Sequence, residues 1–140
     1  MQKFNYISSS PDETKQIGFE LANKVTKGDI IILHGDLGSG KTTFVKGFCK
    51  FFLIEEEEVT SPSFTLMNIY EGTEKIYHFD FYRISDIDNI DSEIFLEYIE
   101  DNKAIKLIEW NKIEIPSTLR VIRVEIDYIS EDKRKINIIT

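Results

Sequence analysis

The sequence is poor in cysteine, in long apolar runs and in positive charge. Its one cysteine, Cys49, has no partner for a disulfide within the chain, which is typical of a reducing compartment. No segment approaches the roughly 18 continuous apolar residues needed to cross a bilayer, and residues 1–6 contain no apolar run of the kind found in signal peptides. We therefore expect a cytoplasmic protein with no membrane partner.

The shortage of positive charge bears on nucleic-acid binding. Lysine and arginine number 17 against 25 aspartates and glutamates, which gives a formal net charge of -8 and a sequence pI of about 4.8. A chain with this balance repels a phosphate backbone over most of its surface. If the protein acts on a nucleic acid, we expect a partner to make the contact.

The residues that are present indicate a globular domain. The chain is 41% hydrophobic and 30% charged, and ten phenylalanines and six tyrosines are ample for a packed interior. A length of 140 residues is that of one domain with one core. We expect a single domain over residues 1–140.

Hydrophobic periodicity predicts a chain that mixes helices and strands. Ser10, Pro11 and Glu13 are typical of a capped helix start, and Gly28 is typical of its end. Residues 29–34 form a β-branched run without alternation, which is typical of a strand buried on both faces. Another helix is expected within residues 86–100, and further strands over residues 64–70, 75–83, 104–109, 119–128 and 133–140. The pattern predicts an α/β fold with a mixed, mainly parallel sheet flanked by helices.

The strongest motif lies between the first of these buried strands and a helix. Residues 35–42 read Gly-Asp-Leu-Gly-Ser-Gly-Lys-Thr and match the pattern G-x-x-x-x-G-K-[ST] at every fixed position. Glycines allow a tight turn whose backbone N–H groups form a nest for phosphate oxygens, while the Lys41 ammonium suits the β- and γ-phosphates and the Thr42 hydroxyl suits Mg²⁺. The following helix carries an apolar stripe of Phe44, Val45, Phe48, Cys49 and Phe52. The motif predicts a P-loop that binds ATP and Mg²⁺ through Asp36, Leu37, Gly38, Ser39, Gly40, Lys41, Thr42 and Thr43.

A second acidic group for the metal is expected at a strand end, and two residues qualify. Asp80 and Glu109 each follow an apolar stretch, and the pattern barely separates them. The alternative for either one is a solvated carboxylate. His78 by itself is more typical of a structural histidine than of a ligand.

Residues 60–65, Thr-Ser-Pro-Ser-Phe-Thr, carry four hydroxyl groups around a proline. Two interpretations stay open at this point. The segment is either a turn that leads into a strand or a mobile loop whose hydroxyls respond to the γ-phosphate or its metal.

Taken together, four motifs resemble the TsaE family, formerly called YjeE, which comprises small bacterial ATPases of tRNA threonylcarbamoyladenosine biosynthesis. In the order of the family, they are residues 35–43, residues 60–64, His78-x-Asp80-x-Tyr82-Arg83 and Ile108-Glu109-Trp110. The resemblance covers nearly the whole chain. It departs after Trp110, where family members commonly have a proline and this chain has Asn111, and in residues 86–91, which are rich in isoleucine, aspartate and asparagine.

The resemblance implies a P-loop NTPase fold and weak, Mg²⁺-dependent ATP hydrolysis. It also implies the TsaB–TsaD pair as protein partners, with tRNA reached indirectly through that complex. Among the residues, it implies that Lys41 and Thr42 bind phosphate and Mg²⁺, and that Asp80 is the metal-linked acid. Residues 60–64 become a switch-like loop. Glu109, as a water-orienting base, and Trp110 are implied to lie at the nucleotide site or the partner surface.

Three other functions remain open from the sequence. Asn111-Lys112-x-Glu114 is similar to the guanine-reading motif N-K-x-D of GTPases, although no D-x-x-G segment follows residues 60–65. A small-molecule kinase would need an arginine-rich clamp for a second phosphate, and this chain has only four arginines. The third is a nucleotide-gated binding module in which hydrolysis is incidental.

Overall fold

The computed structural model describes residues 2–62, 65–84 and 92–140. Its elements in chain order are β1 (Lys3–Ser8), α1 (Pro11–Ala22), β2 (Ile30–His34), α2 (Lys41–Lys50), a short 3₁₀ helix η1 (Glu56–Glu58), β3 (Met67–Glu71), β4 (Lys75–Asp80), α3 (Ser92–Ile99), β5 (Ala104–Glu109), β6 (Val121–Tyr128) and β7 (Arg134–Ile139). None of the helices described is long and apolar enough to pass through a membrane.

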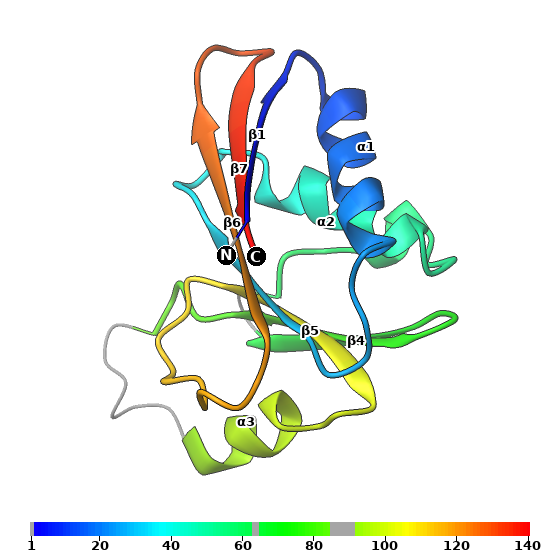
Figure 1. Ribbon diagram of the computed structural model, residues 1–140, viewed down its shortest axis with the longest axis vertical. Coiled ribbons are helices and arrows are strands. Elements are labelled where there is room, and N and C mark those ends of the chain that lie inside the picture. The colour runs from blue at the N-terminus through cyan, green and yellow to red at the C-terminus, as the bar shows by residue number, and fades with distance from the viewer. Residues whose placement is uncertain (1, 63–64, 85–91) are drawn as a thin grey trace.

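The strands form one sheet in the order β1-β7-β6-β2-β5-β4-β3 (Figure 1). The central strands β6, β2, β5 and β4 pair in parallel, whereas β1, β7 and β3 are added antiparallel at the two sides. The predicted α/β fold, with a mixed sheet that is parallel in its centre, is confirmed. Parallel strands end at the same edge of a sheet, so the loops after β2, β4 and β5 meet there.

Helices cover both faces of the sheet. α1 and α2 lie together on one side and α3 on the other (Figure 1), and each side has its own cluster of buried apolar residues. Ile31 and Leu33 of β2 belong to the first cluster and Ile30 and Ile32 to the second. β2 is therefore buried on both faces, as predicted from its unbroken apolar run.

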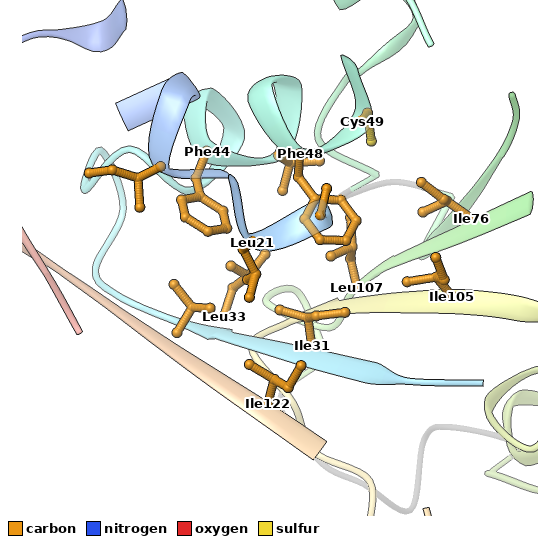
Figure 2. Packing of buried hydrophobic residues seen from close by; sticks show 14 of the residues in the cluster. Leu21, Ile31, Leu33, Phe44, Phe48, Cys49, Ile76, Ile105, Leu107 and Ile122 are labelled. Atoms are coloured by element: carbon orange, nitrogen blue, oxygen red, sulfur yellow. The ribbon is translucent and has the colours of Figure 1, made fainter. Parts of the chain in front are cut away.

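The apolar stripe of α2 fills the space between this helix and the sheet. All five residues predicted on the stripe are buried, including the Cys49 thiol, although Phe52 lies two residues beyond the end of α2. Figure 2 shows Phe44 and Phe48 pointing from α2 towards Ile31 and Leu107 on the sheet. Each such aromatic or aliphatic side chain contributes about 1.5–3 kcal/mol by its removal from water.

The start of α1 is as predicted, but its end is not. The Ser10 Oγ accepts a hydrogen bond from the backbone N of Glu13 at 3.1 Å, and the Glu13 carboxylate accepts one from the backbone N of Ser9 at 2.5 Å. The predicted end at Gly28 is wrong, because the helix stops at Ala22. The next backbone bonds span only three residues, from Lys24 N to Leu21 O at 2.9 Å, and such bonds tighten and close a helix end.

Other differences concern strand ends and one strand that was not predicted. β1 was not predicted. Its residues alternate between exposed and half-buried, and only Ser8 is fully buried. The strand predicted over residues 64–70 begins at Met67, with Phe64 outside the described residues, and the one predicted over residues 75–83 ends at Asp80. The helix predicted within residues 86–100 is described only from Ser92 to Ile99. β5 has the predicted bounds, and β6 and β7 begin two and one residues later than predicted.

Candidate functional site

The glycine-containing loop joins the end of β2 to the start of α2. Gly38 has φ 77° and Gly40 has φ 108°, both in the left-handed region where only glycine is comfortable. Gly40 is also the N-cap of α2, and no side chain caps this helix end. The first backbone N–H groups of α2 therefore have no capping side chain as an acceptor. They lie at the positive end of the helix dipole, where an anion can bind them.

A cavity of about 300 Å³ opens beside this loop. It collects residues from five separate parts of the chain: Leu37, Gly38, Ser39, Gly40, Lys41, Thr42 and Thr43 from the loop and α2, Ser61, Asp80 at the end of β4, Glu109 and Trp110 at and just after the end of β5, and Arg134 at the start of β7. The sequence motifs thus meet at one place, although they are far apart along the chain.

Lys41 is the buried cation of the cavity. Its side chain is 6% exposed, and its ammonium donates a hydrogen bond to the backbone carbonyl of Gly35. Burial lowers the pKa of Lys41 from its ordinary value, while the charges of Glu109, Asp80 and Asp36 act in the opposite direction. An ammonium held partly out of water attracts an anion more strongly than one in bulk water does, because the surroundings screen the charges less.

Trp110 crosses the cavity next to Lys41. Its backbone φ is 53°, a left-handed value that is uncommon for a bulky residue. This turn directs the chain away from β5 and leaves the Lys41 ammonium 4.2 Å from the centroid of the Trp110 ring, within the range of a cation–π contact. The Tyr82 ring lies 4.9 Å from the same indole, so Trp110 is held between an aromatic ring and a cation.

Asp80 and Glu109 are opposite one another in the β4–β5 register. Both residues are buried: Asp80 is 4% exposed and Glu109 is 3% exposed. Asp80 accepts one hydrogen bond from the Ser61 hydroxyl at 3.1 Å and another from the backbone N of Tyr82 at 2.9 Å. These donors orient Asp80 at the cavity wall and tie it to the segment that contains Ser61.

Glu109 has a different set of partners. Its Oε2 lies 2.6 Å from Nε2 of His78, a histidine that is fully buried. The other ring nitrogen, Nδ1, is 2.9 Å from the Tyr70 hydroxyl, and this hydroxyl lies 3.1 Å from the backbone carbonyl of Thr60, to which it can donate. Asp80 and Glu109 therefore sit side by side but in different hydrogen-bonding environments.

Arg134 closes the cavity on the side of the loop. Its Nε donates to the carbonyl of Ser39 at 2.7 Å, and a terminal nitrogen lies 3.5 Å from the carbonyl of Gly38. The other terminal nitrogen donates to carbonyls of the β6–β7 turn, with Ser130 the nearest at 2.6 Å. The guanidinium thus fastens the loop to the turn that follows β6, using the several donors of its planar fork.

The structure brings together most of the predicted site residues. Residues 37–43, Asp80, Glu109 and Trp110 all line the cavity, whereas Asp36 is exposed and is not among the lining residues; its carbonyl accepts from the Ser39 N at 3.0 Å. Of the predicted loop 60–65, Ser61 joins the site, and Ser63 and Phe64 lie outside the described residues.

Two residues of this region, Arg134 and Tyr70, had no role in the sequence-based prediction, and His78 was expected to be a structural histidine. Arg134, Tyr70 and His78 are each held in place by partners distant in sequence. Of these, only His78 carried a signal, through its position in the motif His78-x-Asp80-x-Tyr82-Arg83.

The donor set fits a divalent cation that is shared with a substrate. Across the residues described, no three His, Cys, Asp or Glu side chains gather into a set able to hold a metal by themselves. Mg²⁺ in nucleotide sites is typically held by one or two protein groups together with phosphate oxygens. Asp80 and Thr42, which line the same cavity as the buried Lys41, match that requirement.

A parallel sheet with a glycine-rich loop between β2 and α2, and with carboxylates at the ends of the neighbouring β5 and β4, defines a protein with the P-loop NTPase fold. The loop sequence meets the requirements of that fold at every fixed position. The chain belongs to the TsaE family: the family model for "Threonylcarbamoyl adenosine biosynthesis protein TsaE" matches residues 8–136.

Individual relatives agree with this assignment. The TsaE protein of Rickettsia felis is 36% identical over 136 residues, which cover 96% of this chain and 78% of the relative. The TsaE protein of Aquifex aeolicus is 36% identical and covers 94% of this chain and 92% of its own length. Among solved structures, the crystal structure of Bacillus subtilis YdiB matches with a TM-score of 0.74 at 30% identity, covering 98% of this chain and 84% of that one. The family acts in the biosynthesis of threonylcarbamoyladenosine in tRNA.

Proposed function

We propose that this protein binds ATP with Mg²⁺ and hydrolyses it slowly, as the nucleotide-dependent component of threonylcarbamoyladenosine modification of tRNA. One observation carries the proposal: a glycine-rich loop, a buried ammonium and two buried carboxylates line one cavity of about 300 Å³. A loop of amides and a lysine bind a triphosphate, and carboxylates at the strand ends complete the site for its metal and for water.

The residues of the cavity have distinct roles in this proposal. The loop amides and Lys41 bind the β- and γ-phosphates and hold the triphosphate in one orientation. Thr42 and Asp80 would hold Mg²⁺, Asp80 directly or through a water molecule. When bound, Mg²⁺ neutralises charge that builds up on the bridging oxygen between the β- and γ-phosphates. Glu109 orients or deprotonates the attacking water, a role for which its bond to His78 keeps the carboxylate at the cavity wall.

The segment after Trp110 favours adenine over guanine. The Asn111 side chain donates from Nδ2 to the carbonyl of Ile113 at 3.0 Å and accepts from the backbone N of the same residue at 3.1 Å. Glu114 is exposed and lines a different cavity beside α3. A guanine-reading pair would instead direct both side chains towards the base, so this arrangement supports ATP as the substrate and argues against a GTPase.

The partners in this proposal are the TsaB–TsaD pair, in the cytoplasm, with tRNA contacted through that complex. The net charge of -8 supports an indirect contact with tRNA. The alternative of a nucleotide-gated module predicts tight ATP binding with no stimulation of hydrolysis by TsaB–TsaD. Measuring turnover by the chain with and without the pair separates the two functions, because strong stimulation is expected only for a partner-activated ATPase.

The central test is a nucleotide titration followed by the fluorescence of Trp110, the only tryptophan of the chain. We expect saturable quenching or enhancement with ATP, tighter binding when Mg²⁺ is present, and weaker binding of GTP. Lys41→Ala should weaken ATP binding at least tenfold, whereas Lys46→Ala, on the same helix but outside the cavity, should bind as the wild type does. A wild-type protein that gives no binding heat with any purine triphosphate would contradict the proposal.

The two acids are separated by a second test. Asp80→Ala should lower Mg²⁺-dependent hydrolysis in the complex with TsaB–TsaD while leaving nucleotide binding largely intact. If hydrolysis by this variant equals that of the wild type, the metal-linked role belongs to Glu109 instead.

A further inference from the structure

We propose that His78 and Tyr70 are positioning residues that couple Glu109 to Thr60, so that the orientation of the Glu109 carboxylate and the position of the segment at residues 60–61 change together. This inference rests on the proposed function, since Glu109 is assigned there to the attacking water. It adds a specific physical connection between the nucleotide site and the segment that carries Thr60 and Ser61.

The connection is an unbroken line of short polar contacts. It runs from Oε2 of Glu109 to Nε2 of His78 at 2.6 Å, from Nδ1 of His78 to the Tyr70 hydroxyl at 2.9 Å, and from that hydroxyl to the Thr60 carbonyl at 3.1 Å. It crosses three neighbouring strands of the sheet, β5, β4 and β3, in their hydrogen-bonded order. The two contacts of the Tyr70 hydroxyl are within the normal range for a hydrogen bond, and the contact between Glu109 and His78 is slightly shorter.

Burial makes these contacts sensitive to one another. His78 is 0% exposed, Glu109 3% and Tyr70 5%, so water cannot replace a lost partner without a rearrangement of the strands. Burial also raises the pKa of Tyr70, which keeps the hydroxyl protonated as a donor. A buried polar group that loses its partner is destabilised by about 1–3 kcal/mol, so the members of this line move as a set.

The Tyr70 hydroxyl is the point where the line divides. It carries one proton and can donate either to the Thr60 carbonyl or to His78, but not to both at once. Asn68 holds Thr60 beside this hydroxyl, because its Nδ2 donates to the carbonyl and the hydroxyl of Thr60 at 3.3 and 3.2 Å. A displacement of Thr60 therefore changes how firmly Tyr70 holds His78, and hence how firmly His78 holds Glu109.

Ser61, the residue after Thr60, contacts the second acid of the cavity, Asp80. Ser61 donates to Asp80 at 3.1 Å, and Asp80 lies opposite Glu109 in the β4–β5 register. Two consecutive residues of an exposed segment are thus each connected to one of the two carboxylates of the cavity. An event at the phosphates that moves either carboxylate is transmitted to the same segment, which is the behaviour expected of a two-state element at a nucleotide site.

The test uses a matched pair of variants that each remove one buried tyrosine hydroxyl. Tyr70→Phe deletes the hydroxyl of the proposed connection. Tyr77→Phe, on β4, deletes a hydroxyl that bonds only to Asp101 at 2.7 Å among the contacts described and that faces the α3 side of the sheet. Both tyrosines are 5% exposed, and each change removes a bonded hydroxyl but keeps the ring, so both variants should be destabilised while retaining their packing.

Three measurements on the full-length chain distinguish positioning from plain structural support. We expect Tyr70→Phe to bind ATP–Mg²⁺ within about twofold of the wild type by Trp110 fluorescence, but to hydrolyse it about tenfold more slowly. Hydrogen exchange at residues 59–62 should change on ATP binding in the wild type and in Tyr77→Phe, and this change should be lost in Tyr70→Phe. In a Glu109→Gln background, Tyr70→Phe should cause no further loss of rate, because the group that it positions is already inactive.

The inference is overturned if Tyr70→Phe matches Tyr77→Phe in rate and in exchange, since the tyrosine then serves only the fold. Failure of the proposed function has a different signature. In that case, the wild type itself does not bind ATP, or Lys41→Ala binds it equally well.

Discussion

At the scale of single residues, the orientation of the glycine-rich loop depends on an arginine far away in the sequence. Arg134 binds the carbonyls of Ser39 and Gly38 from outside the loop. The C=O and N–H of one peptide group point in opposite directions, so holding the Ser39 carbonyl outward directs the N–H of Gly40 towards the other side. Arg134 thus prepares a loop amide for an anion without having to touch the anion itself.

We predict that Arg134→Ala weakens ATP binding about tenfold, which corresponds to about 1.4 kcal/mol, because the loop must then be ordered by the ligand. Arg134→Lys should behave in nearly the same way, since one ammonium cannot serve carbonyls on both sides as the guanidinium fork does. Arg123→Ala is the control, because Arg123 is exposed on β6 and lies outside the cavity. Trp110 fluorescence titrations measure the effect, and unchanged affinity in Arg134→Ala would show that the loop is ordered without it.

Cys49 gives a prediction about pH. Burial raises the pKa of its thiol to about 12 from an ordinary 9.0, so the folded protein retains a proton that the unfolded chain loses as the pH rises above 9.0. The free energy of unfolding should therefore fall across this window, by up to about 1.4 kcal/mol per pH unit. Urea denaturation between pH 8 and 10 tests this, because Cys49→Ala should show a shallower decline than the wild type. Parallel pH curves for the two proteins would mean that the thiol is accessible to water.

At the scale of secondary-structure elements, sequence patterns predicted buried elements well and edge elements poorly. β2 and β5 are mostly apolar and almost entirely buried, and the sequence predicted their bounds within one residue. β1 was missed because its inward residues Phe4 and Tyr6 are only half-buried, while Ile7 points outward and is 58% exposed. An alternating pattern disappears when an apolar residue occupies an outward position at a sheet edge.

The same distinction explains what could be foreseen of the site. The loop and the two acids lie directly after buried strands, and parallel strands bring such positions to one edge. The contributions of Arg134 and Tyr70 depend on antiparallel strands at the two sides of the sheet, whose pairing is not encoded in any local motif. The sequence did not reveal which distant strands pair, and Arg134 and Tyr70 lie in no motif that would mark them as site residues.

The α1–α2 pair offers a prediction in which two effects have opposite signs. Gly47 of α2 is packed so closely on α1 that an added Cβ would lie 2.0 Å from the carbonyl oxygen of Lys15 and 2.4 Å from its Cα. Helix propensity alone would make Gly47→Ala stabilising by about 1 kcal/mol. Because the clash is with backbone atoms, we predict instead that the variant is destabilised by about 2 kcal/mol.

Urea denaturation decides between the two signs. Lys50→Ala, on the exposed side of the same helix, is the control and should stay within about 0.5 kcal/mol of the wild type. A Gly47→Ala protein more stable than the wild type would show that the two helices separate easily. In that case, the packing of α1 would not constrain the helix that carries the loop.

At the scale of the whole molecule, the site draws on five separate parts of the chain. Its lining comes from the β2–α2 loop with the start of α2, Ser61, the ends of β4 and β5, and the start of β7, from Leu37 to Arg134. α2, which begins in the site, also packs against the sheet through Phe44 and Phe48. A ligand in this cavity therefore binds only when the central strands and α2 are in place, and its binding free energy is linked to global unfolding.

We predict that ATP with Mg²⁺ at 100 times its Kd stabilises the protein by about 2.7 kcal/mol, measured by urea denaturation at fixed protein concentration. Chelation of Mg²⁺ should remove part of this gain, and Lys41→Ala should remove nearly all of it. An equal gain in Lys41→Ala would place the nucleotide elsewhere. The obvious candidate would then be the cavity of about 310 Å³ beside α1, whose lining combines apolar residues such as Phe4 and Leu21 with the charged residues Glu20, Lys24 and Arg120. Because that cavity shares no lining residue with the glycine-rich loop, the response of a single lysine variant is sufficient to assign the stabilisation to one cavity or the other.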